Sequence, residues 1–403
     1  MDLSLFDVDA PGDLVPITGT DPLRGPWRHS AFVPWPLPDE PPGLSPSTYL
    51  AVGNARAALA ALDSTAQQLP NPRLLRRPTL QTEAQSTSAL EGTYAPLADV
   101  LTADQERPQS VDLREVLNYV SMADRAFRAV EEGQSLTVGL LGELQQVLVH
   151  GTRSEGLATG GLRSSQVVIG RRVEALPEDL PVVAARFVPP PAGLDLQARV
   201  QDLLDWMSAG RPGVIDPVVA AALAHYQFEA LHPFSDGNGR VGRLLIVVHL
   251  LKLGVLAEPT LTVSPWFESR RAEYYDHLFG VSTRGDWDAF VRFFADGLET
   301  SARRTREQML ALVAVQARLK ETVRASSLRA DTAHALVDYA VANTAFTVRA
   351  VERDLRLSYA RANGLVGQLV ELGVLAPLAA SNTYRRRFYA PAVLRVLVGG
   401  RDG

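Results

Sequence analysis

The chain has 403 residues, of which 46% are hydrophobic and 21% are charged, so it is long enough and apolar enough for two or three folded domains. Its formal charge of −5 excludes a surface that is basic throughout, and any nucleic-acid contact must be confined to a local patch. The absence of cysteine excludes disulfides, thiolate nucleophiles and cysteine-ligated zinc.

The sequence predicts neither a signal peptide nor a membrane-spanning segment. Residues 1–7 lack the basic and apolar regions of a signal peptide, and the most apolar run, Leu244 to Leu256, is shorter than a bilayer requires. We therefore expect a cytoplasmic protein without membrane contact.

Residues 1–110 are expected to form an arm followed by helices. Prolines between Pro34 and Pro46 exclude a helix there and predict an extended arm lying over another surface. Helical patterns follow over residues 47–61 and 79–91, with a turn at 70–72 between them and Gly92 as the stop.

Residues 111–300 are expected to form a mainly helical core. Helices are predicted over 114–132, 137–149, 194–208, 217–231, 241–253 and 286–298. Between Gly160 and Gly170, β-branched residues flanked by glycines predict a short β-hairpin. Such a hairpin either grips a peptide by strand addition or merely covers an edge of the core.

A linker helix is predicted at 301–324, within residues 301–330, ahead of a C-terminal unit at 331–403. That unit has helical patterns over 332–342, 348–356 and 359–372, then strand-like pieces at 374–375 and 384–389 around Ser381-Asn382, an order that resembles a winged helix. It contains nine arginines and six acidic residues, which permits contact with DNA. Contact with a protein is an equally open interpretation.

The most informative segment runs from Asp216 to Arg243. Asp216 is a good N-cap and Pro217 a good first residue for a helix, which must end near His232 because Pro233 disfavours helical geometry in the residue before it. His232 is therefore expected at a helix exit, where it can point into a cleft.

The loop that follows His232 predicts an anion site. Gly237 and Gly239 flank Asn238 and free the backbone to turn its N–H groups toward one point at the start of the next helix. Arg240 and Arg243 lie three residues apart, so both can bind oxygens of the same phosphate chain.

Two further side chains complete the predicted chemistry. Asp236 is a suitable oxygen ligand for the Mg²⁺ that accompanies a phosphate chain. A neutral His232 imidazole can take the proton from an attacking hydroxyl. The residues alone predict phosphoryl or nucleotidyl transfer without choosing between them, and the Walker pattern of P-loop enzymes is absent.

The string His232-Pro233-Phe234-Ser235-Asp236-Gly237-Asn238-Gly239-Arg240-Val241-Gly242-Arg243 resembles the signature of the Fic-domain family, His-x-Phe-x-[Asp/Glu]-Gly-Asn-Gly-Arg-x-x-Arg, at every specified position. The resemblance implies an all-helical core that transfers AMP from ATP to a serine, threonine or tyrosine hydroxyl of a target protein, and of itself. It implies His232 as catalytic base, Asp236 as Mg²⁺ ligand, Gly237, Asn238 and Gly239 as the α-phosphate cradle, and Arg240 and Arg243 as the β- and γ-phosphate ligands.

The segment Thr87-Ser88-Ala89-Leu90-Glu91-Gly92 is similar to the family's inhibitory motif, of which Thr87, Glu91 and Gly92 carry the pattern. The resemblance implies that Glu91 pairs with Arg243 and keeps that arginine from the γ-phosphate, so the resting enzyme would be slow. Family members with such a glutamate also remove AMP from modified targets, and this reverse activity is an alternative here.

The likeness extends to two more regions. Gly161, Arg163, Gln166, Val167, Ile169 and Gly170 resemble the family's target-docking flap. The segment from Trp266 to Trp287 resembles the helices that close the adenine pocket, so Tyr274 and Tyr275, together with Gln227 and Glu91, are expected at the nucleotide. Arg270 stands where an asparagine is expected in this segment.

Two other functions stay open at this point. One is a transcriptional regulator in which the winged helix binds DNA and the Fic domain only senses a nucleotide. The other is transfer of a different group, such as UMP or phosphate. A homodimer is also open.

Overall fold

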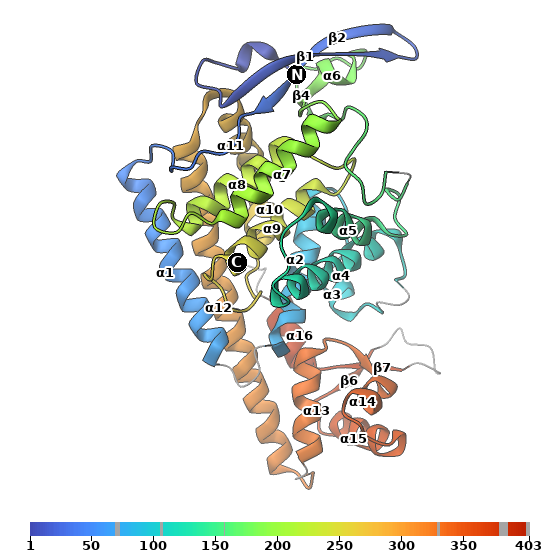
Figure 1. Ribbon diagram of the computed structural model, residues 1–403. Helices are drawn as coiled ribbons and strands as arrows, with labels where there is room; N and C mark the ends of the chain where they lie inside the picture. Colours follow the sequence, from blue (N-terminus) through green and yellow to red (C-terminus); the bar gives the residue numbers. More distant parts are fainter. Residues whose placement is uncertain (69–72, 105–107, 157, 329–330, 379–385, 400–403) are drawn as a thin grey trace.

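The computed structural model describes residues 1–403 except 69–72, 105–107, 157, 329–330, 379–385 and 400–403. Helices dominate, which confirms the predicted fold class, and the strands of the described residues form small antiparallel sheets (Figure 1). The turn expected at 70–72 lies outside the described residues. No helix among the described residues is both long and apolar enough to cross a membrane.

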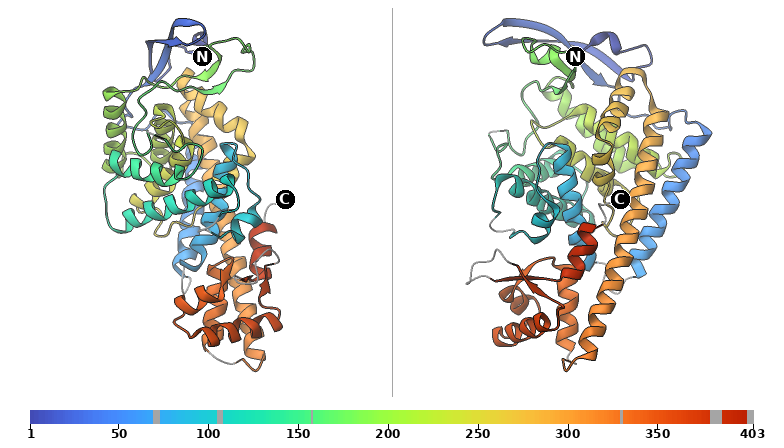
Figure 2. Two further views of the ribbon diagram at one scale, coloured as in Figure 1. Left: turned by 90° about the vertical axis from the view of Figure 1, so that its right-hand side faces the viewer. Right: turned by 180° about the vertical axis from the view of Figure 1, so that it is seen from behind.

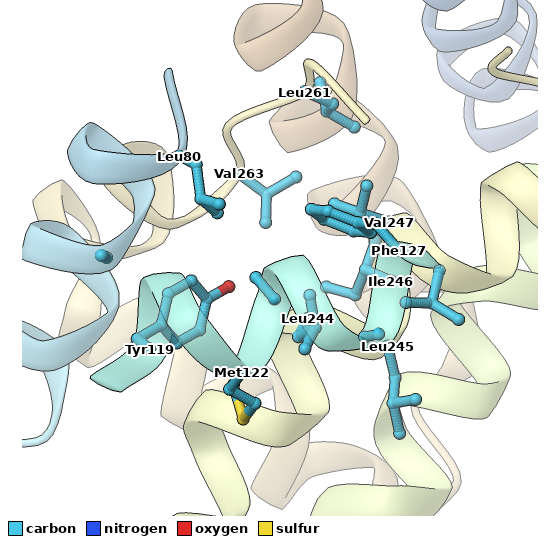
Figure 3. Close-up of a cluster of buried hydrophobic side chains, with 14 of the residues drawn as sticks. Leu80, Tyr119, Met122, Phe127, Leu244, Leu245, Ile246, Val247, Leu261 and Val263 are labelled. Carbon is cyan, nitrogen blue, oxygen red and sulfur yellow. The ribbon is translucent and has the colours of Figure 1, made fainter. Parts of the chain in front are cut away.

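The central body of the molecule is a bundle built around two helices, α8 and α9. Its main helices are α2 (Arg73–Leu90), α4 (Val111–Glu131), α5 (Val138–Val149), α7 (Leu194–Ala209), α8 (Pro217–Leu231) and α9 (Asn238–Lys252). Nearly all residues of α8 and α9 are buried, so neither helix has the solvent-facing polar side of a surface helix. Figure 3 shows Leu80 of α2, Tyr119 and Met122 of α4, and Leu244 and Val247 of α9 in one apolar cluster.

A single helix of 39 residues, α12 (Trp287–Ala325), runs from the central body to the C-terminal part of the molecule (Figures 1 and 2). Helix α1 (Pro46–Gln68) lies along it. The sequence predicts two helices here, 286–298 and 301–324. They are continuous because Glu299, Thr300 and Ser301 include neither glycine nor proline. The short α10 (Ser264–Ser269) and α11 (Arg271–Arg284) precede α12.

The N-terminal region contains a β-ribbon that the sequence does not predict. After a short 3₁₀ turn, η1 (Leu3–Leu5), strands β1 (Gly12–Asp21) and β2 (Gly25–Pro34) pair along their whole length, from Gly12 with Pro34 to Asp21 with Gly25. The proline-rich stretch that follows is extended, as expected, and lies over α7 and α8. There Trp206 donates to the Pro38 carbonyl at 2.8 Å.

A two-stranded flap is present, as predicted, but its bounds differ. Strand β3 (Ile169–Arg171) pairs with β4 (Ala185–Phe187), which follows the short α6 (Pro181–Ala184). The segment from Gly160 to Gly170 is therefore not a hairpin by itself. Its first half is held by Arg163, whose backbone N–H donates to the Pro233 carbonyl at 2.9 Å and whose side chain is buried.

The described part of the C-terminal unit (residues 331–398) has four helices and a three-stranded antiparallel sheet of order β5-β7-β6. Its elements are α13 (Asp331–Ala342), β5 (Phe346–Thr347), α14 (Val348–Asp354), α15 (Tyr359–Glu371), β6 (Ala376–Pro377), β7 (Arg387–Tyr389) and a last helix α16 (Pro391–Val398). The sequence patterns did not predict β5 or α16. Val374 and Leu375, expected as a strand, are buried just ahead of β6, and Ser381-Asn382 lie outside the described residues. Helix α16 packs on α12 and on α3 (Leu97–Thr102).

Candidate active site

His232 lies at the exit of α8, as its sequence context predicts. Asp216 caps the start of the helix by accepting from the Val218 N–H at 2.8 Å, and His232 ends it with a left-handed φ of 47°. This conformation is rare for a side chain other than glycine or asparagine and turns the chain sharply into the loop. The His232 carbonyl accepts from Arg163 Nε at 2.8 Å, which fixes the turn from the other side.

The imidazole of His232 lies in the wall of a cavity, and its Nδ1 is buried without a hydrogen-bond partner among the described residues. Burial lowers the pKa of the His232 imidazole to about 4. The ring is therefore neutral near pH 7 and can accept a proton.

The loop after His232 is braced by Asn238. Its Oδ1 accepts from the Phe234 N–H and its Nδ2 donates to the Phe234 carbonyl, both at 2.8 Å. Gly237 starts α9 with φ of 88°, which glycine adopts without strain. Asn238 is expected in the phosphate cradle at the start of α9, and its side-chain amide is hydrogen-bonded within the loop.

The Glu91 carboxylate lies at the start of α9, where the sequence predicts an anion site. A Cβ added to Gly239 would lie 2.1 Å from Glu91 Oε1, so the carboxylate rests directly on the backbone of the first turn of α9. Carboxylates and phosphates are stabilised at this position by the same N–H groups and the same helix dipole.

Arg243 joins the end of α2 to α9. Its guanidinium is 1% exposed and donates from Nη2 to Glu91 Oε1 at 2.5 Å, from Nε to Thr87 Oγ1 at 2.7 Å and from Nη2 to the Thr87 carbonyl at 3.1 Å. Burial opposes ionisation of Glu91, but the charge and hydrogen bond of Arg243 outweigh it, so the pKa of Glu91 lies below its usual range. The two residues that the resemblance pairs are therefore in contact.

Arg240 and Asp236 form a second charged group beside the loop. Arg240 is 2% exposed, pairs with Glu115 of α4, and lies 3.4 Å from Asp236 Oδ1. Asp236 also accepts from the Gly237 N–H at 2.7 Å and from the Ser154 hydroxyl, which orient its carboxylate. Among the residues that the structure describes, no group of three or more histidine or acidic side chains is arranged to hold a metal ion. Asp236 thus supplies a single carboxylate.

The cavity beside His232 has a volume of about 610 Å³. Glu91, Gly239 and Arg243 line it, together with side chains of α11 and of the flap. The apolar residues of α11 and the flap in this lining, which we call its apolar end, are Tyr275, Leu278, Phe279, Ile169 and Phe187, and Arg171, Arg186 and Arg271 of the same elements also line the cavity. The size and the combination of charged and apolar side chains suit a nucleotide.

Some expected site residues lie elsewhere. Gln227 donates to the Trp35 carbonyl at 2.9 Å, on the side of α8 that faces the N-terminal arm. The Tyr274 hydroxyl is buried against His225 Nε2 at 2.8 Å and does not line the cavity, whereas Tyr275 does. Successive residues of a helix point to different sides, so Gln227 and Tyr274 face away from the cavity although a residue next to each of them in sequence lines it.

Arg163 is also placed differently from its expected role in the flap. It is 2% exposed and donates to the carbonyls of His232, Ser165, Leu231 and Pro190, so it positions the turn at His232 and does not present a docking surface. Of the other flap residues, Ile169 and Gly170 line the cavity, while Gly161, Gln166 and Val167 precede the paired strand.

Sequence reasoning missed three acidic or hydroxyl side chains at the site. Glu115 and Ser154 come from distant segments without a motif, and only the fold brings them to Arg240 and Asp236. Glu229 lies one turn before His232 and lines the cavity with a buried Oε1 that has no partner among the described residues. Burial raises the pKa of the Glu229 carboxyl to about 7. The sequence signal that could have identified Glu229 is its position three residues before His232.

Comparison with known proteins gives matches over the same region. The model of the Fic/DOC family N-terminal region matches residues 49–128, and the model of the Fic/DOC family matches residues 135–250. "Protein adenylyltransferase Fic" of Nematostella vectensis is 30% identical over 191 residues, which are 47% of this chain and 38% of that protein. The protein of the same name from Culex quinquefasciatus is 32% identical over 217 residues, 54% of this chain and 37% of that protein.

The chain thus spans less than two fifths of the length of these relatives. Among solved structures, a Fic family protein from Desulfovibrio desulfuricans G20 has a similar fold, with a TM-score of 0.52 and 24% identity, covering 87% of this chain and 98% of that one.

Proposed function

Because the chain belongs to the Fic/DOC family, we propose that it is a protein adenylyltransferase, which moves AMP from ATP to a hydroxyl side chain of a target protein and of itself. What supports this activity most is the His232 imidazole, which is neutral, unpartnered at Nδ1 and next to the start of α9. A general base and an anion site share one cavity that is large enough for a nucleotide.

In this reaction the attacking hydroxyl oxygen forms a bond with the α-phosphorus, and the bond from that phosphorus to the bridging oxygen breaks, so pyrophosphate leaves. The hydroxyl proton passes to the His232 ring. The N–H groups of the first turn of α9 stabilise the negative charge on the α-phosphate oxygens as the bond forms.

The remaining parts of ATP have matching surfaces. Arg240 and Arg243 provide guanidinium donors for the β- and γ-phosphates, and the nucleoside enters the apolar end of the cavity against Tyr275. Asp236, with one oriented carboxylate beside the phosphate path, suits Mg²⁺, which is commonly held by one or two carboxylates and by phosphate oxygens. When bound there, the ion neutralises phosphate charge.

Glu91 acts as a brake in this proposal. Its carboxylate lies against Gly239 and holds one donor of Arg243, so the γ-phosphate cannot bind Arg243 until Glu91 withdraws. A triphosphate held without that contact has its α-phosphate displaced from the attacking hydroxyl, and small displacements of this kind cost on the order of a hundredfold in rate.

A second candidate activity is hydrolytic removal of AMP from a modified protein. Glu91 and His232 line the same cavity, and the negative charge of Glu91 acts on the His232 ring. A carboxylate at that place can orient a water molecule for attack on the phosphorus.

Label transfer from [α-³²P]ATP to the protein tests the proposal, with ATP, GTP, CTP and UTP compared at the same concentration. We expect His232→Ala to abolish transfer and mass spectrometry to find one AMP on a hydroxyl side chain. Transfer from the γ-position, or transfer that survives His232→Ala, would contradict the assignment. Release of AMP from the labelled protein, lost on Glu91→Gln, would identify the second activity.

A further inference from the structure

Helix α2, which leads to the brake residue Glu91, is buried with an unusually polar face. Its buried polar residues are Thr79, Gln81, Thr82, Glu83, Gln85, Ser86, Thr87 and Ser88. Gln85 Oε1 and Ser88 Oγ have no hydrogen-bond partner among the described residues. Because a buried helix with so many polar side chains is held largely by specific polar contacts, the position of α2 depends on the elements that supply those contacts.

The C-terminal unit supplies such contacts to the N-terminal half of α2, the half away from Glu91. The Thr344 hydroxyl is 3.1 Å from Gln81 Oε1 and also contacts the Leu101 carbonyl. Arg77 Nη1 donates to Asn343 Oδ1 at 3.4 Å. One helix is thus tied to the catalytic arginine at its C-terminal end and to the C-terminal unit near its N-terminal end.

A groove of about 490 Å³ lies at this junction. Two acidic residues, Asp104 and Asp354, face five basic residues in its lining, Arg77, Arg349, Arg353, Arg386 and Arg387. Two of these arginines are ion-paired, Arg349 with Glu352 and Arg353 with Asp354. With Glu352 included, basic residues still outnumber acidic ones here although the chain as a whole is acidic, and they come from α2, α14 and β7 with the residue before it.

Helix α15 begins beside the groove and continues its surface. Tyr359 and Asn363 line the groove, and Arg361 and Gln368 are exposed farther along the helix. Gly364 faces open space, which allows a close approach by a partner. Arginine, asparagine and glutamine are the side chains that read base edges in the major groove and contact phosphates. Figures 1 and 2 show α14 and α15 on the side of the C-terminal unit away from α12.

We propose that this face of the C-terminal unit binds duplex DNA and that DNA binding releases the Glu91 brake; the regulatory half rests on the adenylyltransferase function proposed above. A basic groove on an otherwise acidic chain favours a polyanion over a neutral or basic partner. The exposed helix with base-reading side chains next to this groove favours a duplex among polyanions.

The groove also gives the mechanism of release. Arg77 and Arg387 each donate across the junction to an uncharged oxygen, Arg77 to the Asn343 side chain and Arg387 Nη2 to the Ala103 carbonyl at 2.6 Å. A phosphate is a stronger partner for a guanidinium than either oxygen. Phosphates in the groove therefore replace these contacts, loosen the hold of the C-terminal unit on α2 and favour the state in which Glu91 leaves Arg243.

The test uses the full chain and a fluorescent random-sequence DNA duplex. Anisotropy measures binding at low and moderate salt, and label transfer from [α-³²P]ATP to the protein is measured with and without DNA. We expect binding to weaken steeply with salt and labelling to rise about tenfold with DNA. The double variant Arg349→Ala/Arg361→Ala, at exposed positions, should lose both effects, while Arg24→Ala on the β-ribbon tip should lose neither.

A coupling variant separates DNA binding from its effect on the brake. Thr344→Val keeps the shape of the side chain and removes its contact with Gln81. It should bind DNA as the wild type does, with higher labelling in the absence of DNA and a smaller rise on its addition.

The Glu91→Gly variant separates failure of this inference from failure of the proposed function. If it labels itself while the wild type neither binds DNA nor responds to it, the inference is wrong and the function stands. If it does not label itself, the function and the regulation both fail, and DNA binding is judged by anisotropy alone. An equal response to heparin, or self-association through this face without DNA binding, would also overturn the assignment to duplex DNA.

Discussion

Replacing Glu91 with glycine removes a carboxylate whose Oε1 lies 2.5 Å from Arg243 Nη2. Arg243 keeps its hydrogen bonds to the Thr87 hydroxyl and carbonyl, so the guanidinium stays in place. The site against Gly239 is vacated at the same time. Both the anion site and one donor of Arg243 then become available to the phosphates of ATP.

The size of the effect follows from the contact that is lost. A hydrogen bond to a charged group contributes about 1.5–3 kcal/mol, and roughly 1.4 kcal/mol corresponds to a tenfold change in rate or equilibrium. Self-labelling should therefore rise about tenfold to a hundredfold. The free energy of unfolding should fall by about 1–3 kcal/mol in the same variant, because the buried Arg243 charge loses its counter-ion.

Initial rates of label transfer and melting temperatures, measured on the same preparations, check both directions. Glu91→Gln is the matched control, since it keeps the shape and removes the charge, and it should give an intermediate rate. Each background is repeated with His232→Ala. Equal rates for the wild type and Glu91→Gly would refute the brake, as would a faster variant whose labelling survives His232→Ala.

Three more predictions concern pH and backbone space. In Glu91→Gly, kcat/KM should be level between about pH 6 and 8, because the His232 pKa of about 4 leaves the ring neutral throughout, and a tenfold rise over this range would contradict that role. Burial raises the pKa of Glu83 from 4.5 to about 7, so the stability that its proton contributes is complete below about pH 4.5 and lost as pH rises through 7. Urea denaturation from pH 6 to 8.5 should show the wild type losing about 1.4 kcal/mol more than Glu83→Gln. In the Glu91→Gly background, Gly239→Ala places a Cβ in the space that Glu91 Oε1 otherwise takes and that we assign to phosphate, so it should abolish self-labelling, whereas Gly364→Ala meets open space and should not lower labelling or melting temperature.

Local sequence signals predicted the catalytic turn well. Asp216 and Pro217 start α8, and Pro233 ends it at His232, because capping and proline geometry act over a few residues and need no tertiary information. The contact between Glu91 and Arg243 was expected only from the resemblance, since 152 residues separate the two. The roles of the site residues in catalysis stay predictions.

Other features depend on packing that a local pattern does not encode. The β1 sequence contains Pro16 and Gly19, and only Ile17 of this strand is buried, so the alternation that identifies strands is missing. Arg163 reads as an exposed flap residue, yet four carbonyls converge on it once the loop is folded. Glu115 lies outside any motif, and only the folded chain brings it to Arg240, whose charge it neutralises.

The order of segments along the chain has a consequence for biosynthesis. The helix that leads to Glu91 precedes the loop it blocks, and a ribosome makes it first. When the glycine loop emerges, the carboxylate that fits it is already present in the nascent protein. Under the function that we propose, the restraint is therefore synthesised before the site that it restrains.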